Sequence, residues 1–374
     1  MNSRIFLASP HMSSDGYELE YIHDAFRKNW ISPLGENVTA FEDAIADYLE
    51  NTCPVALASG TAALHLSMIL AGVKAGDLVF CQSLTFAASA NPIAYTGATP
   101  VFIDSERDTW NLDPAALKRA IALYGVPKAL VVVHLYGTPA RMQEITAICE
   151  KHGITLIEDA AEALGSTYGG RCCGSLGEYG VISFNGNKII TSSGGGMLLC
   201  PDRQKAAMAL KLATQAREPF PWYQHEMIGY NYRLSNISAG IGRGQMKVLP
   251  QRIIRKQEIF RRYRRNLENL PFEFQLGCDK GVANRWLTAV LLEEGCGVSP
   301  AELIRVLESE NIESRHVWKP LHSQPVFANN AYITVGEESV CDDLFARGLC
   351  LPSNTQMTDD DVDRVCGLIR KVFK

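Results

Sequence analysis

The sequence predicts an α/β fold: a large domain with a mostly parallel central sheet, followed by a smaller C-terminal α+β domain. From residue 54 onward, short apolar runs alternate with stretches of helical spacing, a pattern typical of a parallel sheet with helices on its faces. Near Leu249 this alternation gives way to one long helical stretch. Because 374 residues exceed the usual size of a single core, we expect two domains, residues 1–248 and 249–374.

The first fifty residues predict an entry segment made of two helices. Apolar residues recur with helical spacing over 17–29 and again over 37–49. Pro33 and Gly35 lie between the two stretches and indicate a loop.

The large domain is expected to alternate strands with helices. Its predicted strands lie at 55–58, 78–81, 100–103, 129–134 and 155–158, with two more near 181–184 and 197–199. Its predicted helices lie at 62–71, 86–95, 114–123 and 139–151. In the small domain we expect a long helix over 251–270, strands at 288–292 and 312–316, and helices at 300–311 and 359–372.

Composition and charge narrow the class of protein. The chain is 47% hydrophobic and 21% charged, as globular proteins are, and its net charge of -5 argues against a nucleic-acid partner. Half of residues 252–265 are basic, which we interpret as a solvated helix face. The eleven cysteines contain no CxxC pair and indicate core thiols rather than disulfides or a metal site. Without a signal peptide or a long apolar run, we expect a cytoplasmic protein with no membrane partner.

The stretch VISFNGNKIITSSGGGMLLC, residues 181–200, presents a single lysine, Lys188, in a compact loop between two apolar strands. Burial lowers the pKa of an amine, so a lysine in such a loop can act as a nucleophile and form a Schiff base with a carbonyl. Taken alone, the stretch favours the plainer interpretation of a simple hairpin with a turn lysine, because charged turns are common.

Two further positions suggest a phosphorylated cofactor. Gly60-Thr61 lies between a strand and a helix N-terminus, where free N–H groups bind phosphate, although a plain capping turn has the same pattern. Asp159 ends a strand about thirty residues before Lys188. Pyridoxal phosphate needs both residue types, the lysine for its aldehyde and the aspartate to keep its ring nitrogen protonated. Phe86 could cover the cofactor ring or pack in the core, and Ser183 could add a phosphate hydroxyl.

The order and spacing of these motifs resemble the DegT-type nucleotide-sugar aminotransferases of pyridoxal phosphate fold type I, the aspartate-aminotransferase superfold. The resemblance covers essentially the whole chain and is carried by PLGENVTAFEDAIADYL, SGTAALHL, SLTFAASANPI, HLYG, IEDAAEALG, SFNGNKIITSSGGG, GYNYRLSNISAGIG and KPLH. The variants EDAAEALG and SFNGNKIITSSGGG are most similar to enzymes of bacillosamine synthesis.

The resemblance implies roles for individual residues. Lys188 matches the Schiff-base lysine that also moves the proton, and Asp159 matches the partner of the pyridinium nitrogen. Phe86 matches the ring-stacking residue. The phosphate cup is matched by Gly60, Thr61 and Ser183, and by Asn231 from a neighbouring subunit, which implies a homodimer with shared active sites. Regions that line the nucleotide-sugar pocket are matched by Asn284, Arg285, Trp286, Arg315 and His322, for each of which a structural role is an equal alternative.

Glu162 departs from the pattern, because many relatives carry Gln or His three residues after the aspartate, near the cofactor's 3-hydroxyl. A carboxylate there could hold the proton shared with that hydroxyl or touch the sugar. Since Glu162 fits the bacillosamine-type variant, we interpret it as a mark of that subgroup.

The resemblance implies a ping-pong transamination with pyridoxal 5'-phosphate and its pyridoxamine form. L-glutamate would be the donor, and UDP-4-keto-6-deoxy-N-acetylglucosamine would be aminated at C4. Another 4-keto or 3-keto nucleotide sugar is the alternative substrate. A sugar 3-dehydratase is disfavoured because those relatives replace the lysine by His. A non-catalytic regulator or binding protein would need neither Lys188 nor Asp159, and a nicotinamide dehydrogenase would need a GxGxxG turn.

Overall fold

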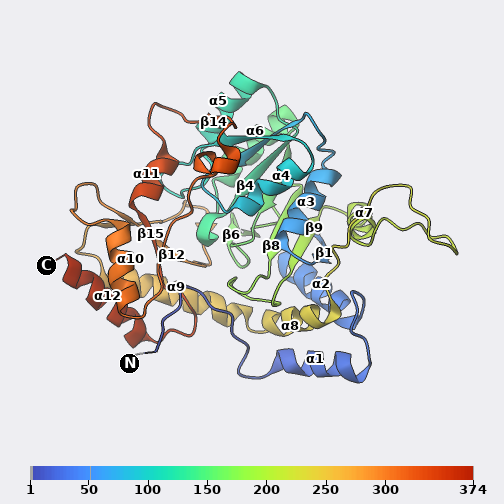
Figure 1. The fold of residues 1–374 in the computed structure, drawn as a ribbon, viewed down its shortest axis with the longest axis horizontal. Helices are drawn as coiled ribbons and strands as arrows, with labels where there is room; N and C mark the ends of the chain where they lie inside the picture. Colours follow the sequence, from blue (N-terminus) through green and yellow to red (C-terminus); the bar gives the residue numbers. More distant parts are fainter. Residues whose placement is uncertain (1–2, 51, 374) are drawn as a thin grey trace.

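A sheet of eight strands forms the centre of the molecule (Figure 1) in this computed structural model, which describes residues 3–50 and 52–373. The strands, in their order across the sheet, are β1 (Cys53–Leu57), β9 (Gly196–Cys200), β8 (Tyr179–Ser183), β5 (Thr155–Asp159), β4 (Ala129–Val133), β2 (Leu78–Gln82), β3 (Thr99–Ile103) and β14 (Tyr332–Ile333). Every neighbouring pair is parallel except those that β9 makes with β1 and β8. The prediction of a mostly parallel sheet is therefore confirmed.

Both faces of this sheet are buried, as its continuous apolar strands predict. Val131 and Ile157 belong to one buried cluster, whereas their chain neighbours Leu130 and Leu156 belong to another on the opposite face. The helices of this part of the chain are α1 (Tyr17–Arg27), α2 (Glu36–Leu49), α3 (Gly60–Leu70), α4 (Asn91–Tyr95), α5 (Pro114–Tyr124), α6 (Met142–His152), α7 (Arg203–Ala213) and α8 (Asn236–Met246).

The single helix expected over 86–95 is wrong, because the segment is broken in two. A short 3₁₀ turn, η1 (Ala87–Ser89), precedes α4, which begins at Asn91 with Pro92 in its first turn. Proline lacks the N–H that a helix interior requires and is accommodated in a first turn. The break leaves residues 83–90 as an irregular connection at the end of β2.

The C-terminal part contains a second sheet, antiparallel, with the order β10 (Phe272–Phe274), β12 (Thr288–Leu292), β15 (Gly348–Leu351) and β13 (Arg315–His316). Its own buried cluster joins this sheet to α9 (Leu249–Asn266), α10 (Pro300–Ser309) and α12 (Asp359–Val372). The helix α11 (Val340–Arg347) precedes β15. The strand expected over 312–316 is shorter, because Ile312 pairs instead with Ile5 near the N-terminus. A third, small sheet contains β11 (Gly281–Val282), β6 (Thr167–Tyr168) and β7 (Arg171–Cys172).

Two strand-like contacts connect the two predicted domains, residues 1–248 and 249–374. The residues around Ile5 lie against Ile312 of the C-terminal part, and β14 extends the large sheet beside β3. The expected large domain is thus tied to the C-terminal part near its N-terminus and at the β3 side of its sheet, and the division itself stays a prediction.

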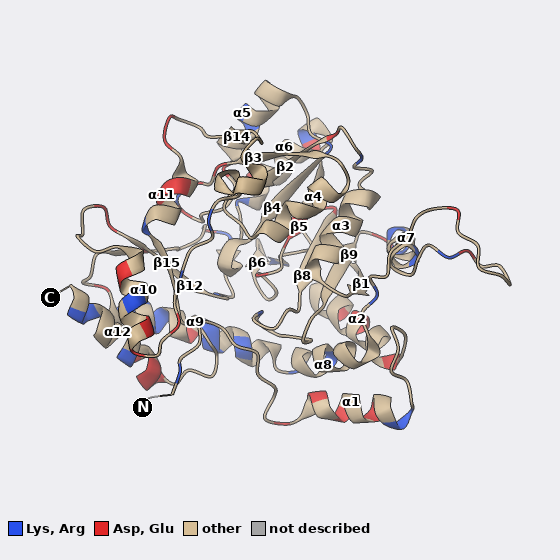
Figure 2. Ribbon diagram, in the orientation of Figure 1, with Lys and Arg blue, Asp and Glu red and all other residues tan. Residues whose placement is uncertain are grey.

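Figure 2 shows basic residues along α9, and several of them contact neighbouring groups. Arg255 and Arg262 pair with Asp359, and Arg262 pairs also with Asp363 of α12. Lys256 is buried.

No helix in the described part of the chain is both long enough and apolar enough to cross a membrane.

Candidate active site

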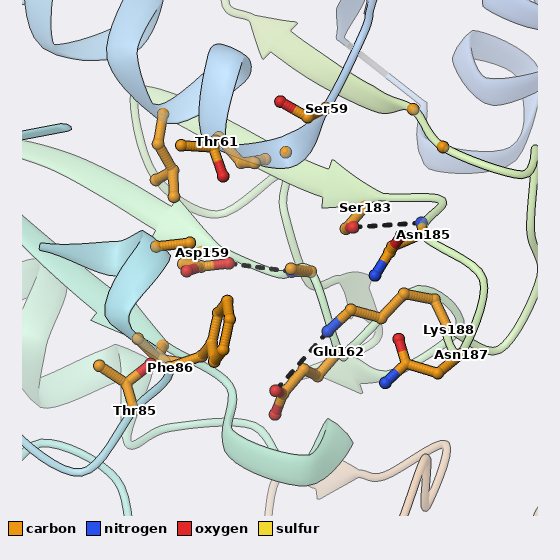
Figure 3. Close-up of a pocket in the computed structure, with 18 of the residues that line it drawn as sticks. Ser59, Thr61, Thr85, Phe86, Asp159, Glu162, Ser183, Asn185, Asn187 and Lys188 are labelled. Atoms are coloured by element: carbon orange, nitrogen blue, oxygen red, sulfur yellow. Dashed lines mark hydrogen bonds and ion pairs between the residues drawn. The ribbon is translucent and has the colours of Figure 1, made fainter. Parts of the chain in front are cut away.

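A cavity of about 350 Å³ opens at the carboxyl ends of the parallel strands, where ligands of open α/β sheets bind (Figure 3). It is lined at the ends of β1, β2, β5 and β8 and by the loop after β8. Eight residues singled out in the sequence lie around it, namely Gly60, Thr61, Phe86, Asp159, Glu162, Ser183, Lys188 and Trp286. The fold therefore gathers residues that are up to 226 positions apart in the chain.

Lys188 enters the cavity from the turn that follows β8. Its backbone N–H donates to the Asn185 carbonyl at 3.0 Å, and its side chain is only 14% exposed. The Nζ atom lies 3.7 Å from Glu162 Oε1 and 4.2 Å from the centroid of the Trp286 ring. The Trp286 ring is fixed in turn by its Nε1, which donates to the Asn187 carbonyl at 2.8 Å. The amine thus lies between a carboxyl group and an aromatic face.

Glu162 lies beside that amine (Figure 3) and is almost completely buried. Its Oε2 accepts a hydrogen bond from the backbone N–H of Tyr136 at 2.7 Å. Burial raises the pKa of the Glu162 carboxyl, and the nearby Lys188 charge only partly opposes this effect. Glu162 can therefore hold a proton close to the lysine.

Asp159 ends β5 and is 5% exposed. Its Oδ2 accepts from the Ser89 hydroxyl at 2.6 Å, and its Oδ1 accepts from the Ala161 N–H at 3.2 Å. Across residues 3–50 and 52–373, no Lys, Arg or His forms an ion pair with this carboxylate. A buried anion is costly without a cation nearby. The site thus fits a ligand with a protonated ring nitrogen.

The N-terminus of α3 forms the other end of the cavity, where Figure 3 shows Ser59 and Thr61 away from Glu162. Ser59 caps the helix by accepting from the Ala62 N–H at 3.1 Å. Gly60 permits close packing, since a Cβ there would lie 3.2 Å from the Ser183 Cβ. The backbone N–H groups of a helix N-terminus bind phosphate, and here the hydroxyls of Ser59 and Thr61 lie beside them in the cavity lining.

The ring of Phe86 stands in the cavity and is 56% exposed (Figure 3). Its centroid lies 5.6 Å from that of Trp318, which also lines the cavity. An exposed aromatic ring near Asp159 offers a face to a flat ligand.

Among the residues expected near the nucleotide sugar, Asn284 and Arg285 are engaged by the protein itself and do not line this cavity. The fully buried Asn284 amide donates to the carbonyls of Glu162 and Leu164 and accepts from the Trp286 N–H. The Arg285 guanidinium donates to two backbone carbonyls and lies 3.9 Å above the Phe260 ring.

Arg315, His322 and Asn231 also lie outside the lining of the cavity. The exposed Arg315 pairs with Glu313 at 2.7 Å. His322 is hydrogen-bonded to Ser83 Oγ at 2.7 Å and stacks on Tyr332 with centroids 3.6 Å apart. Asn231 was expected to act in a neighbouring subunit, so its place in a single chain leaves that prediction open.

Three side chains of the site were not singled out by the sequence patterns. Ser89 lay inside a segment predicted to be a continuous helix. Tyr136 stands within HLYG, a motif quoted only for resemblance, and adopts a φ of 54° that orients its N–H toward Glu162. Trp318 has no local signal, because tertiary packing alone brings it to Tyr136 and Phe86.

Comparison with known proteins agrees with this geometry. A model of the DegT/DnrJ/EryC1/StrS aminotransferase family matches residues 13–370. EpsN of Bacillus subtilis (strain 168), whose name assigns it provisionally to the pyridoxal phosphate-dependent aminotransferases, is 49% identical over 379 residues, covering 100% of this chain and 97% of EpsN. GDP-perosamine synthase of Caulobacter vibrioides is 36% identical, covering 99% of this chain and 98% of that protein.

A solved structure is similar over the same length. DesI, crystallised in the presence of its TDP-sugar product, superposes with a TM-score of 0.89 at 28% identity, covering 100% of this chain and 94% of that chain. With the family model matching almost the entire sequence, this chain belongs to the DegT/DnrJ/EryC1/StrS aminotransferase family and uses pyridoxal 5'-phosphate as its cofactor.

Proposed function

We propose that this protein transfers the amino group of L-glutamate to C4 of UDP-4-keto-6-deoxy-N-acetylglucosamine, giving UDP-4-amino-4,6-dideoxy-N-acetylglucosamine. The observation that carries the proposal is the position of the Lys188 amine, 3.7 Å from Glu162, in a cavity that also contains the Asp159 carboxylate, with which no cation of the described residues pairs. A site that merely bound a sugar would have no need for that pair of groups.

When bound, pyridoxal phosphate supplies an electron-withdrawing ring that stabilises negative charge at the carbon from which a proton is removed. The chain's own residues would hold it at three points. The α3 N-terminus, with Thr61 and Ser183, would bind the phosphate, and Phe86 would cover one ring face. Asp159 would balance the charge of a protonated ring nitrogen.

Lys188 would then act twice, first as the attachment point for the cofactor aldehyde and then as the base that moves a proton. Two contacts support the second role. The Trp286 ring restricts where the freed amine can lie, and the buried Glu162 carboxyl provides a second proton-holding group 3.7 Å from Nζ. Low exposure of both groups limits competition from water.

The amino acceptor is proposed to be a nucleotide sugar because relatives are named for such compounds. One is a GDP-perosamine synthase, and another was crystallised with its TDP-sugar product. These names involve different nucleotides, so a different 4-keto or 3-keto nucleotide sugar is the alternative substrate. Arg315 and His322 are proposed to reach the sugar or its diphosphate in the complex, with Arg285 and Asn284 supporting the pocket wall.

We further propose a homodimer in which Asn231 completes the phosphate site of the partner. The segment between α7 and Asn231 projects from the rest of the molecule (Figure 1), and it carries Trp222, Tyr223 and Ile228 with exposed fractions of 60%, 78% and 84%. Large apolar side chains in one exposed segment are typical of a surface that another subunit covers.

Absorbance spectra test the proposal. The protein with cofactor should show a yellow band that L-glutamate bleaches, and Lys188→Ala should lack this band. Adding UDP-, GDP- or TDP-linked 4-keto-6-deoxy sugars to the bleached protein then identifies the acceptor, because only a substrate restores the band. NMR of the product locates the new amine. A protein that stays colourless with added cofactor would contradict the proposal, whereas recovery only with a GDP- or TDP-sugar would replace the UDP substrate by the alternative.

A further inference from the structure

Three buried side chains, two of which line the cavity, form a continuous line of hydrogen bonds at its wall. Thr85 and Ser89 are 3% and 1% exposed, and Asp159 is 5% exposed. The two hydroxyl oxygens lie 2.8 Å apart, and the Ser89 Oγ lies 2.6 Å from Asp159 Oδ2. Ser89 is the last residue of η1, before α4 begins at Asn91, and from there its hydroxyl reaches Asp159 at the end of β5.

The direction of these hydrogen bonds follows from counting protons. Each hydroxyl has one proton to donate, and an ionised carboxylate can only accept. Ser89 gives its proton to Asp159, so Thr85 must be the donor in the Thr85–Ser89 pair. Thr85, which also lines the cavity, then has only acceptor capacity left on its Oγ1.

This line of donors bears directly on the charge of Asp159. A hydrogen bond to the charged form of a carboxyl favours that form, and bonds to a charged acceptor are about twice as strong as neutral ones. The other donor that the structure gives to this carboxylate is the Ala161 N–H, at the longer distance of 3.2 Å. A donor chain also polarises its members in the same direction, which strengthens the terminal bond.

We propose that Ser89 and Thr85 are positioning residues that keep Asp159 ionised and oriented, so that the ring nitrogen of the bound cofactor stays protonated. This inference rests on the proposed role of Asp159. It assigns the electron-withdrawing state of the cofactor to three residues rather than one. It also explains why a serine and a threonine are buried beside an acidic side chain with no cation from the described chain.

The test uses the holoenzyme with ring-¹⁵N-labelled cofactor. Ser89→Ala should shift the ¹⁵N signal toward the unprotonated ring and weaken binding of pyridoxamine phosphate about tenfold, since it removes a bond to a charged group. Thr85→Val, which keeps the shape but loses the distal donor, should shift the signal in the same direction and weaken binding about threefold. Ser89→Thr should restore both values.

Matched controls separate this role from simple folding effects. Ser67 is equally buried, and its hydroxyl donates to the Leu64 carbonyl at 2.7 Å, outside the cavity. Ser67→Ala should leave the ¹⁵N signal unchanged even if it lowers thermal stability. Should Ser89→Ala lose the cofactor altogether, Thr85→Val decides the question.

Asp159→Asn distinguishes the inference from the proposed function beneath it. If Asp159→Asn shifts the ¹⁵N signal while Ser89→Ala and Thr85→Val leave it at the wild-type value, the positioning role is overturned and that of Asp159 stands. If Asp159→Asn itself leaves the signal unchanged, the proposed role of Asp159 fails, and the inference fails with it.

Discussion

The Nζ atom of Lys188 and the Oε1 atom of Glu162 lie 3.7 Å apart, with side-chain exposures of 14% and 5%. The sequence patterns suggested a carboxylate near the cofactor but not a carboxyl group beside the lysine itself. This pair joins the β8–β9 connection to the segment that follows β5. Its charge state depends on burial, which disfavours a Glu162 anion, and on the lysine, which favours it.

The first prediction concerns Glu162→Gln and pH. Burial raises the pKa of Glu162 in the folded protein, so the folded state favours the protonated carboxyl. The stability due to this group is fully present below the pKa of the unfolded chain and is lost as pH rises through the folded value. Glutamine keeps an acceptor for the Tyr136 N–H without the charge. Apo Glu162→Gln should therefore melt at a higher temperature than the wild type at pH 8.

Thermal melts of both apo proteins from pH 4 to pH 8 check this expectation. The difference in melting temperature should be largest at the alkaline end and small near pH 4, where the wild-type carboxyl is protonated in both states. A difference that is constant across this range, or that grows toward acid, would contradict the assigned direction of the pKa shift.

Much of this architecture could be predicted because its signals are local. The apolar runs of β4 and β5 indicated parallel strands, Asp159 ends β5, and Lys188 lies in the turn after β8. The helix α8 was missed because Gly240, Gly242 and Gly244 weaken its helical propensity. These glycines permit close packing: a Cβ at Gly242 would lie 2.5 Å from the Phe41 ring.

The polar contacts of the site were beyond local patterns. The Ser89 hydroxyl donates to Asp159, 70 residues away in the sequence. The backbone N–H of Trp318 donates to the Tyr136 hydroxyl, 182 residues away. Only the folded chain determines such partners. The same is true of Asn284, whose expected place near a sugar gave no hint that its amide is saturated by backbone groups.

Asn284→Ala should mainly lower stability. The substitution leaves the carbonyls of Glu162 and Leu164 and the N–H of Trp286 without their side-chain partner in a fully buried place. Each buried unpaired group costs about 1–3 kcal/mol, so the free energy of unfolding should fall by about 3 kcal/mol or more. Urea denaturation measures this change. Arg315→Ala is the matched control, since its exposed ion pair contributes at most about 1 kcal/mol. Equal effects of the two substitutions would argue against a positioning role for Asn284.

Gly196→Ala and Gly194→Ala should differ although both change the same glycine run. A Cβ at Gly196 would lie 2.4 Å from the Gly60 nitrogen, so the α3 N-terminus must move. Overpacking of this kind costs about 1–3 kcal/mol. A Cβ at Gly194 meets no described atom within 4 Å. Only Gly196→Ala should lower the melting temperature of the apoprotein and weaken binding of inorganic phosphate in the cavity. Equal melting temperatures would mean that the contact between β9 and α3 is readily relaxed.

Lys256 gives a prediction of the opposite pH direction. Its ammonium group is buried and donates to the carbonyls of Trp286 and Ser353, and burial lowers its pKa to about 7, with Arg252 adding to the effect. The unfolded chain therefore binds this proton more tightly than the folded one between about pH 7 and the ordinary lysine value of 10.5. Over that window the Lys256 contribution to stability should rise with pH, by at most about 1.4 kcal/mol per pH unit.

Urea denaturation of the wild type and Lys256→Met at pH 7, 8 and 9 isolates this contribution. Methionine removes the charge but also leaves the two carbonyls unpaired, so the variant should be less stable at every pH. What matters is the trend: the stability difference between wild type and variant should widen from pH 7 to pH 9. A difference that stays level would mean that the folded protein binds the Lys256 proton as tightly as the unfolded chain does. The Trp286 carbonyl is one acceptor of Lys256 and the Trp286 ring faces Lys188, so the titrating amine contacts a residue of the active-site wall.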